Sequence, residues 1–451
     1  MSQVLAPTDD TPVRRVLIVA DNISLRQSGE TSVPYYYLQG FVRRGIDVRA
    51  VCHARVQEGL RRDIPAELFR RIHFVEDSWL QMLLWRIGQR LPYRVEDLVI
   101  GQVLNTLTQR RMRRVAARLV AAHGMQIVFQ PTPISPKSLS LMNGLGAPLV
   151  IGPMCGGLEL PPAFRHMDGR LVGLSIAASR AEVNLLHRLF PGKRKAAALL
   201  VGNARTARAL PPGVRGKVYE VVESGVDLQR WPPKAYPVDR ADGIVRFVFC
   251  GRLVDWKGAQ YLVRAFAPLA RRGGVRLDLI GDGELFGSIR EMVAAEGIGD
   301  AVVLHGRIPL QKFIDVLREG DVYVMPSLRE CGGLALLEAM AIGLPIVATN
   351  WMGPAEYLDR TSAILVDPTS EQAFIDEFSA AMSRLARSPD LRRSLGEGAR
   401  RRVLAGYFGW ERKADRVIQI MGEVLTELRP TAFWPGSGPA AAARRLSRSI
   451  R

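Results

Sequence analysis

Short apolar segments alternate with segments of helical periodicity along most of this chain, and this alternation limits the possible folds more than any other feature. It is clearest after residue 243, where each apolar run is followed by a helical pattern. Alternating strands and helices of this length favour a parallel, doubly wound sheet. We expect strands at residues 245–250, 275–280, 301–304, 322–325, 345–348 and 363–366, with helices near 258–271, 285–296, 310–318 and 334–342.

The first half of the chain carries the same pattern. An apolar run at 16–20, a helical pattern at 33–44 and a second apolar run at 47–52 form a strand–helix–strand unit. Further strands are expected at residues 127–130, 148–151, 198–201 and 218–222. The sequence therefore predicts an α/β protein with two Rossmann-like domains, each a doubly wound parallel sheet.

A proline-rich polar stretch separates the two halves, as is typical of a linker. Two sheets joined in this way place a cleft between the carboxyl ends of their strands, where ligands bind in such folds. We divide the chain into a first domain, a linker, a second domain, a final helix and a basic tail that we expect to be flexible. Their ranges are 1–228, 229–243, 244–407, 408–428 and 429–451.

The positive net charge of the chain suits an anionic partner. The chain of 451 residues has 62 lysines and arginines against 44 acidic residues, a formal net charge of +18. This balance fits nucleic acid, an anionic membrane face or a phosphorylated substrate, although a solvated arginine-rich surface explains it equally simply. We recognise no motif that reads nucleic acid, so we expect no nucleic-acid partner.

The chain shows no sign of secretion or of a membrane span. Its first twelve residues lack the basic and apolar regions of a signal peptide, and no run of 18 apolar residues occurs. The four cysteines are widely spread, which argues against a disulfide framework or a structural zinc site. We expect a cytoplasmic protein, with the inner face of the cytoplasmic membrane as an alternative location.

One segment supports that alternative. Residues 79–87 mix tryptophans, leucines and an arginine, and such a helix could lie among lipid headgroups or be a buried amphipathic helix. Farther on, helical spacing places Arg110, Arg114 and Arg118 along one face. Both interpretations of residues 79–87 remain open at this point.

The most informative stretch for chemistry is 326–345, in which a buried strand leads through Gly332 and Gly333 into an apolar helix. Glycines permit close backbone approach, and the first amides of a helix suit a phosphate. Glu330 lies in the loop and Glu338 in the helix, where their carboxylates can accept hydrogen bonds from sugar hydroxyls. Glu338 could instead be an acid favoured by the helix dipole.

Two further loops follow strands of the second domain. Residues 250–258 contain Arg252 and Lys257, a planar donor fork and a compact cation that both suit phosphate oxygens. The alternative is that they are two surface cations in a loop between a strand and a helix. The turn at 281–284 ends the next strand with glycine and acid, a weak signal alone because most such turns are only structural.

As a set and in order, these residues resemble the retaining glycosyltransferases of family 4 (group 1), which have the GT-B fold. Glu330 and Glu338 match the family's E-x7-E signature, and the likeness covers the second domain almost completely. In the first half it is looser, with Gly29 in the first loop and residues 223–227 similar to the family's N-G-V-D. Residues 408–411 look like the start of the family's last helix, which crosses back onto the first domain.

The resemblance implies a transfer from a nucleoside-diphosphate sugar to a glycan or lipid-linked acceptor, in the synthesis of a surface polysaccharide or exopolysaccharide. It implies that Arg252 and Lys257 bind the diphosphate, that Glu338 binds the ribose and that Glu330 binds the transferred sugar. We expect catalysis by Arg252, Lys257 and Glu330, and donor binding by Gly29, Arg252, Lys257, Asp282, Arg307, Glu330, Gly332, Gly333, Leu334 and Glu338.

The acceptor side is less defined. Gln130, Thr132, Cys155 and Gly156 are candidate contacts because they lie in or next to loops that follow strands of the first domain. Gln130 stands near the place where many family members have a histidine, and Gly332 replaces the family's usual aromatic. These two departures put a borrowed histidine role and the sugar preference in doubt.

Metal and cofactor expectations are negative. No Asp-x-Asp occurs in the chain, and the six histidines show no metal-binding spacing. We therefore expect transfer without a metal and no cofactor besides the nucleotide sugar. The alternatives are another GT-B enzyme, such as a sugar-nucleotide epimerase or a glycogen-type synthase, and a basic nucleic-acid-binding protein.

Overall fold

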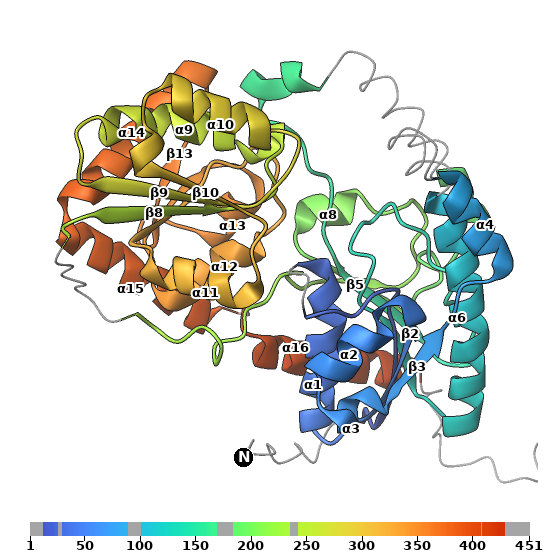
Figure 1. The fold of residues 1–451 in the computed structure, drawn as a ribbon. Coiled ribbons are helices and arrows are strands. Elements are labelled where there is room, and N and C mark those ends of the chain that lie inside the picture. Colours follow the sequence, from blue (N-terminus) through green and yellow to red (C-terminus); the bar gives the residue numbers. More distant parts are fainter. Residues whose placement is uncertain are drawn as a thin grey trace, which may run out of the picture.

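The structure is a computed structural model and describes residues 12–25, 29–88, 101–168, 184–234, 242–406 and 408–428 (Figure 1). The predicted basic tail at 429–451 and the first eleven residues lie outside the described residues. The described strands form two sheets, and all their pairings are parallel. The predicted α/β class with two doubly wound sheets is therefore confirmed.

The first sheet has seven strands in the order β3-β2-β1-β4-β5-β6-β7. Its strands are β1 Arg15–Val19, β2 Asp47–His53, β3 Ile72–Val75, β4 Ile127–Gln130, β5 Leu149–Met154, β6 Ala198–Val201 and β7 Lys217–Glu220. The central strands β4, β5 and β6 are buried throughout, as expected of strands covered on both faces.

Helices cover this sheet on both faces. The helices of the first half include α1 Val33–Arg43, α2 Gln57–Asp63, α3 Ala66–Phe69, α4 Trp79–Gly88, α6 Gln102–His123 and α8 Ala204–Arg208. The first half also contains the short 3₁₀ turns η1 Glu30–Ser32, η2 Ala54–Val56 and η4 Pro162–Met167. The α6 helix ends at Gly124, which takes the left-handed conformation that stops a helix (φ 56°).

The second sheet has six strands in the order β10-β9-β8-β11-β12-β13. They are β8 Val245–Cys250, β9 Val275–Ile280, β10 Val302–Gly306, β11 Val322–Met325, β12 Ile346–Thr349 and β13 Ala363–Val366. The strand order reverses between β8 and β11. The carboxyl ends of neighbouring strands diverge at such a reversal, which leaves a crevice for a ligand.

The helices of the second domain follow its strands in turn. They are α9 Ala259–Ala270, α10 Phe286–Ala295, α11 Leu310–Glu319, α12 Leu334–Ile342, α13 Met352–Tyr357, α14 Glu371–Arg387 and α15 Pro389–Ala405, with the turns η5 Asp255–Lys257 and η6 Gly299–Ala301. Seven residues of α12 are buried, which explains why its sequence is almost wholly apolar.

The last helix, α16 Trp410–Leu428, packs against α1 of the first domain (Figure 1). Its Trp410 stacks on Tyr36 with ring centroids 4.7 Å apart, and Ala414 and Met421 join the first domain's core. Where the chain returns to the first domain, Val226 pairs with Gly409 in an isolated parallel bridge. The two segments that connect the domains, one before the second domain and one before α16, therefore lie side by side.

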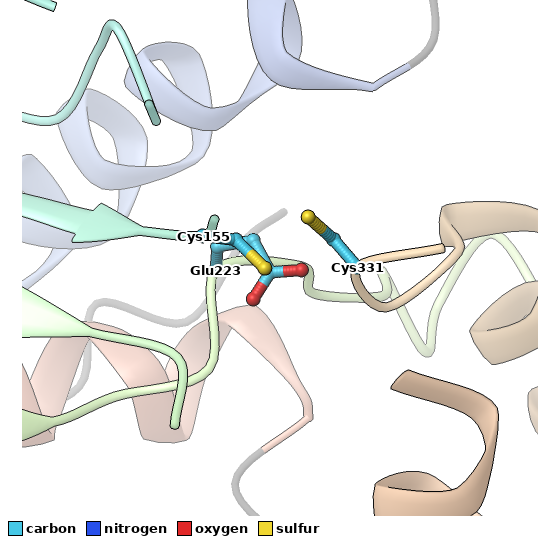
Figure 2. A group of neighbouring side chains, drawn as sticks. All are labelled: Cys155, Glu223 and Cys331. Atoms are coloured by element: carbon cyan, nitrogen blue, oxygen red, sulfur yellow. The ribbon is translucent and has the colours of Figure 1, made fainter. Parts of the chain in front are cut away.

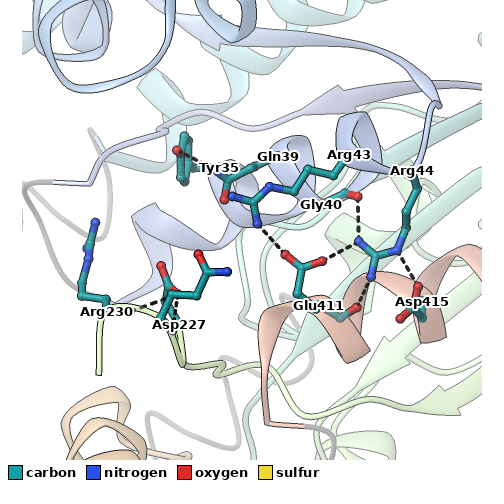
Figure 3. A network of polar contacts seen from close by, with 10 residues as sticks. Tyr35, Gln39, Gly40, Arg43, Arg44, Asp227, Arg230, Glu411 and Asp415 are labelled. Carbon is teal, nitrogen blue, oxygen red and sulfur yellow. Dashed lines mark hydrogen bonds and ion pairs between the residues drawn. The ribbon is translucent and has the colours of Figure 1, made fainter. Parts of the chain in front are cut away.

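A polar network fastens α16 to α1 (Figure 3). Arg44 contacts Glu411 at 2.8 Å and also pairs with Asp415, while Arg43 reaches the other oxygen of Glu411 at 2.7 Å. Because only a small part of the Arg44 side chain is exposed, water screens its two ion pairs less than those of a free surface arginine.

Residues of the first half also contact the second domain directly. The η4 turn inserts Phe164 into the second domain's core, beside Tyr261 and Phe374, with ring centroids 5.6 and 5.5 Å away. Polar contacts add to this interface. They join Asn203 and Arg205 to Glu356, Trp351 to the carbonyl of Glu159, and Arg329 to Asp168.

Candidate active site

A cavity of about 560 Å³ lies where the reversal of strand order predicts it. One wall is formed by residues at or just after the carboxyl ends of β8, β9 and β10, together with the first turns of α12. The opposite wall includes Ser32 and Tyr36 near the start of α1, and the segment 225–231. The cavity therefore lies in the cleft between the two domains.

Five of the predicted donor residues line this cavity. They are Arg252, Asp282, Arg307, Leu334 and Glu338. The first three stand directly after β8, β9 and β10, so parallel strands place them at one edge of the sheet. Leu334 and Glu338 come from α12, whose first turn faces the same hollow.

Glu338 is a buried carboxyl group at the base of the cavity, with 8% of its surface exposed. Burial disfavours its charged form and raises its pKa to about 8. The positive charge of Arg230 and a hydrogen bond with the Trp231 side chain act in the opposite direction and only partly offset the burial. Glu338 is thus poised to hold or release a proton near neutral pH.

Lys257 and Glu330 do not line this cavity; they form an ion pair with one another. Lys257 ends the turn after β8, and Glu330 lies in the loop between β11 and α12. Their side chains are only 21% and 12% exposed. Lys257 follows Arg252 in the segment after β8, and Glu330 lies in the loop that leads to Leu334 at the start of α12. The ion pair is therefore close in sequence to two residues that line the cavity.

Three glycines allow the loops to approach one another closely. A Cβ on Gly332 would lie 2.2 Å from the Tyr357 hydroxyl, and Gly333, which precedes α12, has a φ of 77°. Gly281, which follows β9, has a φ of 137°, and a Cβ there would lie 1.9 Å from the carbonyl oxygen of Gly251. A larger residue at Gly281 would push apart the loops that carry Arg252 and Asp282.

Gly29 lies at the start of the η1 turn and does not itself line the cavity. Its carbonyl oxygen accepts a hydrogen bond of 2.9 Å from Ser32, which does line the cavity. Its φ of 91° favours glycine. Gly29 therefore helps to set the conformation of the first loop.

None of the four candidate acceptor residues lines the cavity in the cleft. Gln130 is buried and accepts a hydrogen bond from Ser140 at 2.6 Å. The buried Thr132 hydroxyl has no hydrogen-bond partner among the described residues. The amide of Gly156 donates to Thr206 at 3.1 Å, and Cys155 points toward Glu223 and Cys331 (Figure 2).

Three residues that line the cavity were not among the predicted site residues. Tyr36 lies in α1, while Arg230 and Trp231 precede the described start of the second sheet. Tyr36 lies among apolar residues of α1, a pattern typical of a helix packed in the core, so the sequence did not indicate that it lines a cavity. Arg230 could have been found, because it comes three residues after the segment similar to N-G-V-D.

The first domain has a second cavity of about 480 Å³, at the carboxyl ends of β1, β2 and β3. Asp21, Arg55, Asp77, Asn105 and Trp85 are among its lining residues. Burial raises the pKa of Asp21 to about 6, which the charge of Arg55 partly offsets. Carboxylates, an amide and an indole together are suited to a polyhydroxylated ligand.

The sequence of the second domain matches that of a known group of enzymes. Residues 245–384 match the family described as "Glycosyl transferases group 1". A curated relative, the D-inositol 3-phosphate glycosyltransferase of Saccharomonospora viridis, is 34% identical over 242 residues, 50% of this chain and 53% of the relative. The chain thus spans about half the length of the curated relatives it matches.

Solved structures share the arrangement of both domains. Sucrose-phosphate synthase from Thermosynechococcus elongatus is 17% identical with a TM-score of 0.64, covering 92% of this chain and 100% of that one. The Anabaena protein HepE, solved with UDP-glucose, is 15% identical with a TM-score of 0.56 at the same coverage. At this identity the likeness concerns the fold, and the predicted GT-B fold is confirmed.

Proposed function

We propose that this chain is a retaining glycosyltransferase of family 4 that transfers a sugar from a nucleoside-diphosphate sugar to a glycan or lipid-linked acceptor. The observation that carries this proposal is the cavity at the strand reversal of the second sheet, lined by Arg252, Arg307 and Glu338. The match of residues 245–384 to a glycosyltransferase family supports it, and so does the UDP-glucose complex of HepE.

The first chemical task is to stabilise the departing diphosphate. Negative charge develops on it as the bond to the sugar breaks, and preorganised donors lower the barrier most. Arg252 offers a planar fork in the cavity, and the first amides of α12 carry the positive end of a helix dipole. Lys257 would join them by exchanging part of its contact with Glu330 for a phosphate oxygen.

The second task is to hold the two sugars of the donor. In the proposed role, Glu338 bonds to the ribose, and with its raised pKa it can donate one hydrogen bond and accept another. Glu330, which belongs to the loop leading into α12, would then accept from hydroxyls of the transferred sugar. A side chain on Gly332 or Gly333 would meet Tyr357 or Met325, so these glycines allow the close packing of the loop that carries Glu330.

We further propose that the transfer needs no metal. Two cations and a helix start can neutralise the diphosphate, and no Asp-x-Asp is present in the sequence to hold a cation on it. The expected result is full turnover after extensive treatment with a chelator. Loss of activity on chelation, restored by Mg²⁺ or Mn²⁺, would contradict this part of the proposal.

A thermal-shift screen against GDP-, UDP- and ADP-sugars tests the donor assignment. A ligand that binds only the native state raises apparent stability, so one donor should stand out. With that donor, release of the nucleoside diphosphate should fall strongly in Glu330→Ala and Lys257→Ala. Equal turnover in both variants and the unaltered protein would defeat the assignment, and a product without a new glycosidic linkage would favour an epimerase.

The acceptor is proposed to bind in the first domain. The 480 Å³ cavity combines Asp21 and Asp77, which can accept from hydroxyls, with Arg55, which can bind an anionic group. A phosphorylated polyol, such as the one in the name of the S. viridis relative, and the lipid-linked glycan of a surface polysaccharide both have this chemistry. Comparing the two as acceptors in the same assay distinguishes them.

We propose that the first domain rests on an anionic lipid surface through α4. Trp79, Met82, Leu83 and Trp85 are strongly exposed, with 72% of Trp79 and 55% of Trp85 accessible to solvent. On the neighbouring α6, Arg110, Arg114 and Arg118 are exposed as well. Among the described residues, no helix has an apolar stretch long enough to cross a bilayer, so such contact would be peripheral.

Sedimentation with vesicles tests this contact. The protein should bind vesicles containing phosphatidylglycerol and release them at high salt, since surface charges are screened. The double change Trp79→Ser and Trp85→Ser should abolish binding. Leu404→Ser, which removes an exposed apolar side chain (43% accessible) from α15, is the control and should bind normally.

A further inference from the structure

We propose that Cys155, Glu223 and Cys331 form a binding site for a zinc-like divalent cation, and that this cation ties the first domain to the second. The two sulfur atoms and a carboxylate oxygen lie within 4.8 Å of one another (Figure 2). This inference does not depend on the proposed transfer reaction. None of the three residues lines the cavity assigned to the donor.

The three ligands come from both sides of the cleft. Cys155 follows β5 and Glu223 follows β7, both at the carboxyl edge of the first sheet. Cys331 belongs to the loop between β11 and α12 of the second sheet. A single ion held by all three would therefore join the first domain to the loop that carries Glu330.

The ligand set fits a borderline-soft cation. Zinc binds thiolates at about 2.3 Å and carboxylate oxygens at about 2.0–2.2 Å in tetrahedral geometry, which puts the ligand atoms about 3.5–3.8 Å apart. The present separations of up to 4.8 Å need to shrink by about 1 Å at most. Magnesium and calcium, in contrast, prefer oxygen ligands only.

The backbone around each ligand is already fixed. The amide of Cys155 donates to Ile134 at 2.8 Å, and the amide of Gly353 donates to the carbonyl oxygen of Glu330 at 3.2 Å. A Cβ on Gly353 would lie 1.5 Å from the Cys331 carbonyl oxygen, so the Cys331 loop lies tightly against α13. Little chain entropy remains to be lost when an ion binds.

The carboxylate is equally confined. A Cβ on Gly202 would lie 2.6 Å from an oxygen of Glu223, and the Tyr357 hydroxyl lies 3.5 Å from the other oxygen. Only 4% of Cys155 and 4% of Glu223 is exposed, whereas Cys331 is half-buried. The open side at Cys331 leaves access for the ion and for a fourth ligand such as water.

Binding at this site balances in charge and atoms. The dication forms bonds to two sulfur atoms and one carboxylate oxygen, and the two thiol protons pass to solvent. Lys413, whose ammonium group donates to the carbonyl of Val222, stands near Glu223 and tempers its negative charge. No oxidation or reduction is involved.

Cobalt provides a direct readout, because Co²⁺ bound to thiolates gives a charge-transfer band in the near ultraviolet. Reduced full-length protein titrated with Co²⁺ should show this band at one equivalent, and Zn²⁺ should displace it. Cys155→Ser and Cys331→Ser should each weaken binding at least ~10-fold, and Glu223→Gln should weaken it while preserving the band at high Co²⁺. Circular dichroism and melting curves confirm that each variant is folded.

Cys52→Ala is the matched control, since Cys52 is a free thiol of the first domain outside the cluster. It should bind Co²⁺ like the unaltered protein. Absence of the band, or a band that persists in Cys331→Ser, would overturn the proposal. So would mass spectrometry showing that Cys155 and Cys331 are joined as a disulfide in protein that takes up no cobalt after reduction.

Discussion

The ammonium group of Lys257 is paired with the carboxylate of Glu330, and the two residues come from loops that follow neighbouring strands, β8 and β11. Two residues expected to act on different parts of a donor are thus paired with one another in this structure. An incoming diphosphate would have to compete for Lys257, which frees the Glu330 carboxylate for the transferred sugar. In the proposed function, donor binding and sugar orientation would therefore be coupled through this pair.

Replacing either partner should therefore affect catalysis more than it affects folding. We expect Lys257→Met and Glu330→Gln each to lower kcat by about 10²–10³, the usual effect of losing one preorganised charged group. Thermal melting should show that each single change destabilises the protein and that the double change recovers part of the loss, because no unpaired buried charge remains.

Activity should not recover in that double variant. Lys312→Ala removes an exposed lysine of α11 and is the matched control, with activity and melting unchanged. A double variant that regains turnover would mean that the pair is purely structural.

Glu338 should make stability depend on pH. Its pKa is raised by burial from 4.5 to about 8, so between these values the folded protein holds a proton that the unfolded chain has released. Stability from this group is complete below about pH 4.5 and is lost as the pH rises toward about 8. The contribution of Glu338 to the urea midpoint should therefore decline between about pH 5 and about pH 8 in the unaltered protein.

In Glu338→Gln this decline should be smaller, because glutamine has no proton to lose. Other groups titrate identically in the two proteins, so the difference between the two slopes reports Glu338 alone. Parallel slopes would show that its carboxyl group is ionised throughout this range.

Two glycine-to-alanine changes should have opposite effects on stability. Gly281 has a φ of 137° and lies against the carbonyl oxygen of Gly251, so Gly281→Ala should destabilise the protein by about 2 kcal/mol or more. Gly287 lies in α10 with open space around it, and Gly287→Ala should stabilise by about 0.5–1 kcal/mol. Denaturant unfolding of both variants checks this; equal effects would contradict the close approach at Gly281.

The docking of α16 should depend on Arg44. Its guanidinium contacts Glu411 and Asp415 and also donates to the carbonyl of Gly40 within α1. We expect Arg44→Ala to destabilise the protein by about 1 kcal/mol, since both acids are partly exposed and regain water. Arg401→Ala, which removes a far more exposed arginine paired with Glu397, should change stability little.

Hydrogen exchange localises the effect of Arg44→Ala. Amides of α16 should exchange faster in that variant, whereas amides of α12 should not change. Faster exchange in both helices would indicate a general loss of stability instead of a loosened docking contact.

The fold of the second domain could be predicted almost residue by residue. Most of its strands are short, mainly apolar segments, and the ranges expected for β8, β9, β11 and β13 agree with the observed ones. In the first domain β3 was missed. Its four residues, Ile-His-Phe-Val, lie at the edge of the sheet with two of them only half-buried, and so short a mixed run has no distinct period.

The candidate site could be predicted where position along a strand determines it. Arg252, Asp282 and Arg307 directly follow strands, and parallel strands bring such residues to one edge. The partners of side chains could not be predicted, because they depend on the path of loops. The pairing of Lys257 with Glu330, and the meeting of Cys155 with Cys331 across the cleft, both belong to this class.

The segment at 79–87 shows the same limit. Its composition allowed a helix among lipid headgroups or one packed in the core, and the structure exposes its tryptophans while burying Gln81 against Thr108 of α6. The polar Gln81 is thus buried in the contact with α6 while the tryptophans are exposed, the reverse of ordinary amphipathic packing. Hydrophobicity alone could not predict which side of this helix is buried.

The parallel bridge between Val226 and Gly409 has a practical consequence for anyone who wishes to study one half of the molecule by itself. A fragment ending near residue 228 would lack Trp410, Ala414 and Met421, and would leave the apolar face of α1 bare. The first half should be expressed with residues 408–428 attached, for example as a fusion across a short designed loop. Such a fusion would restore the apolar side chains that cover α1.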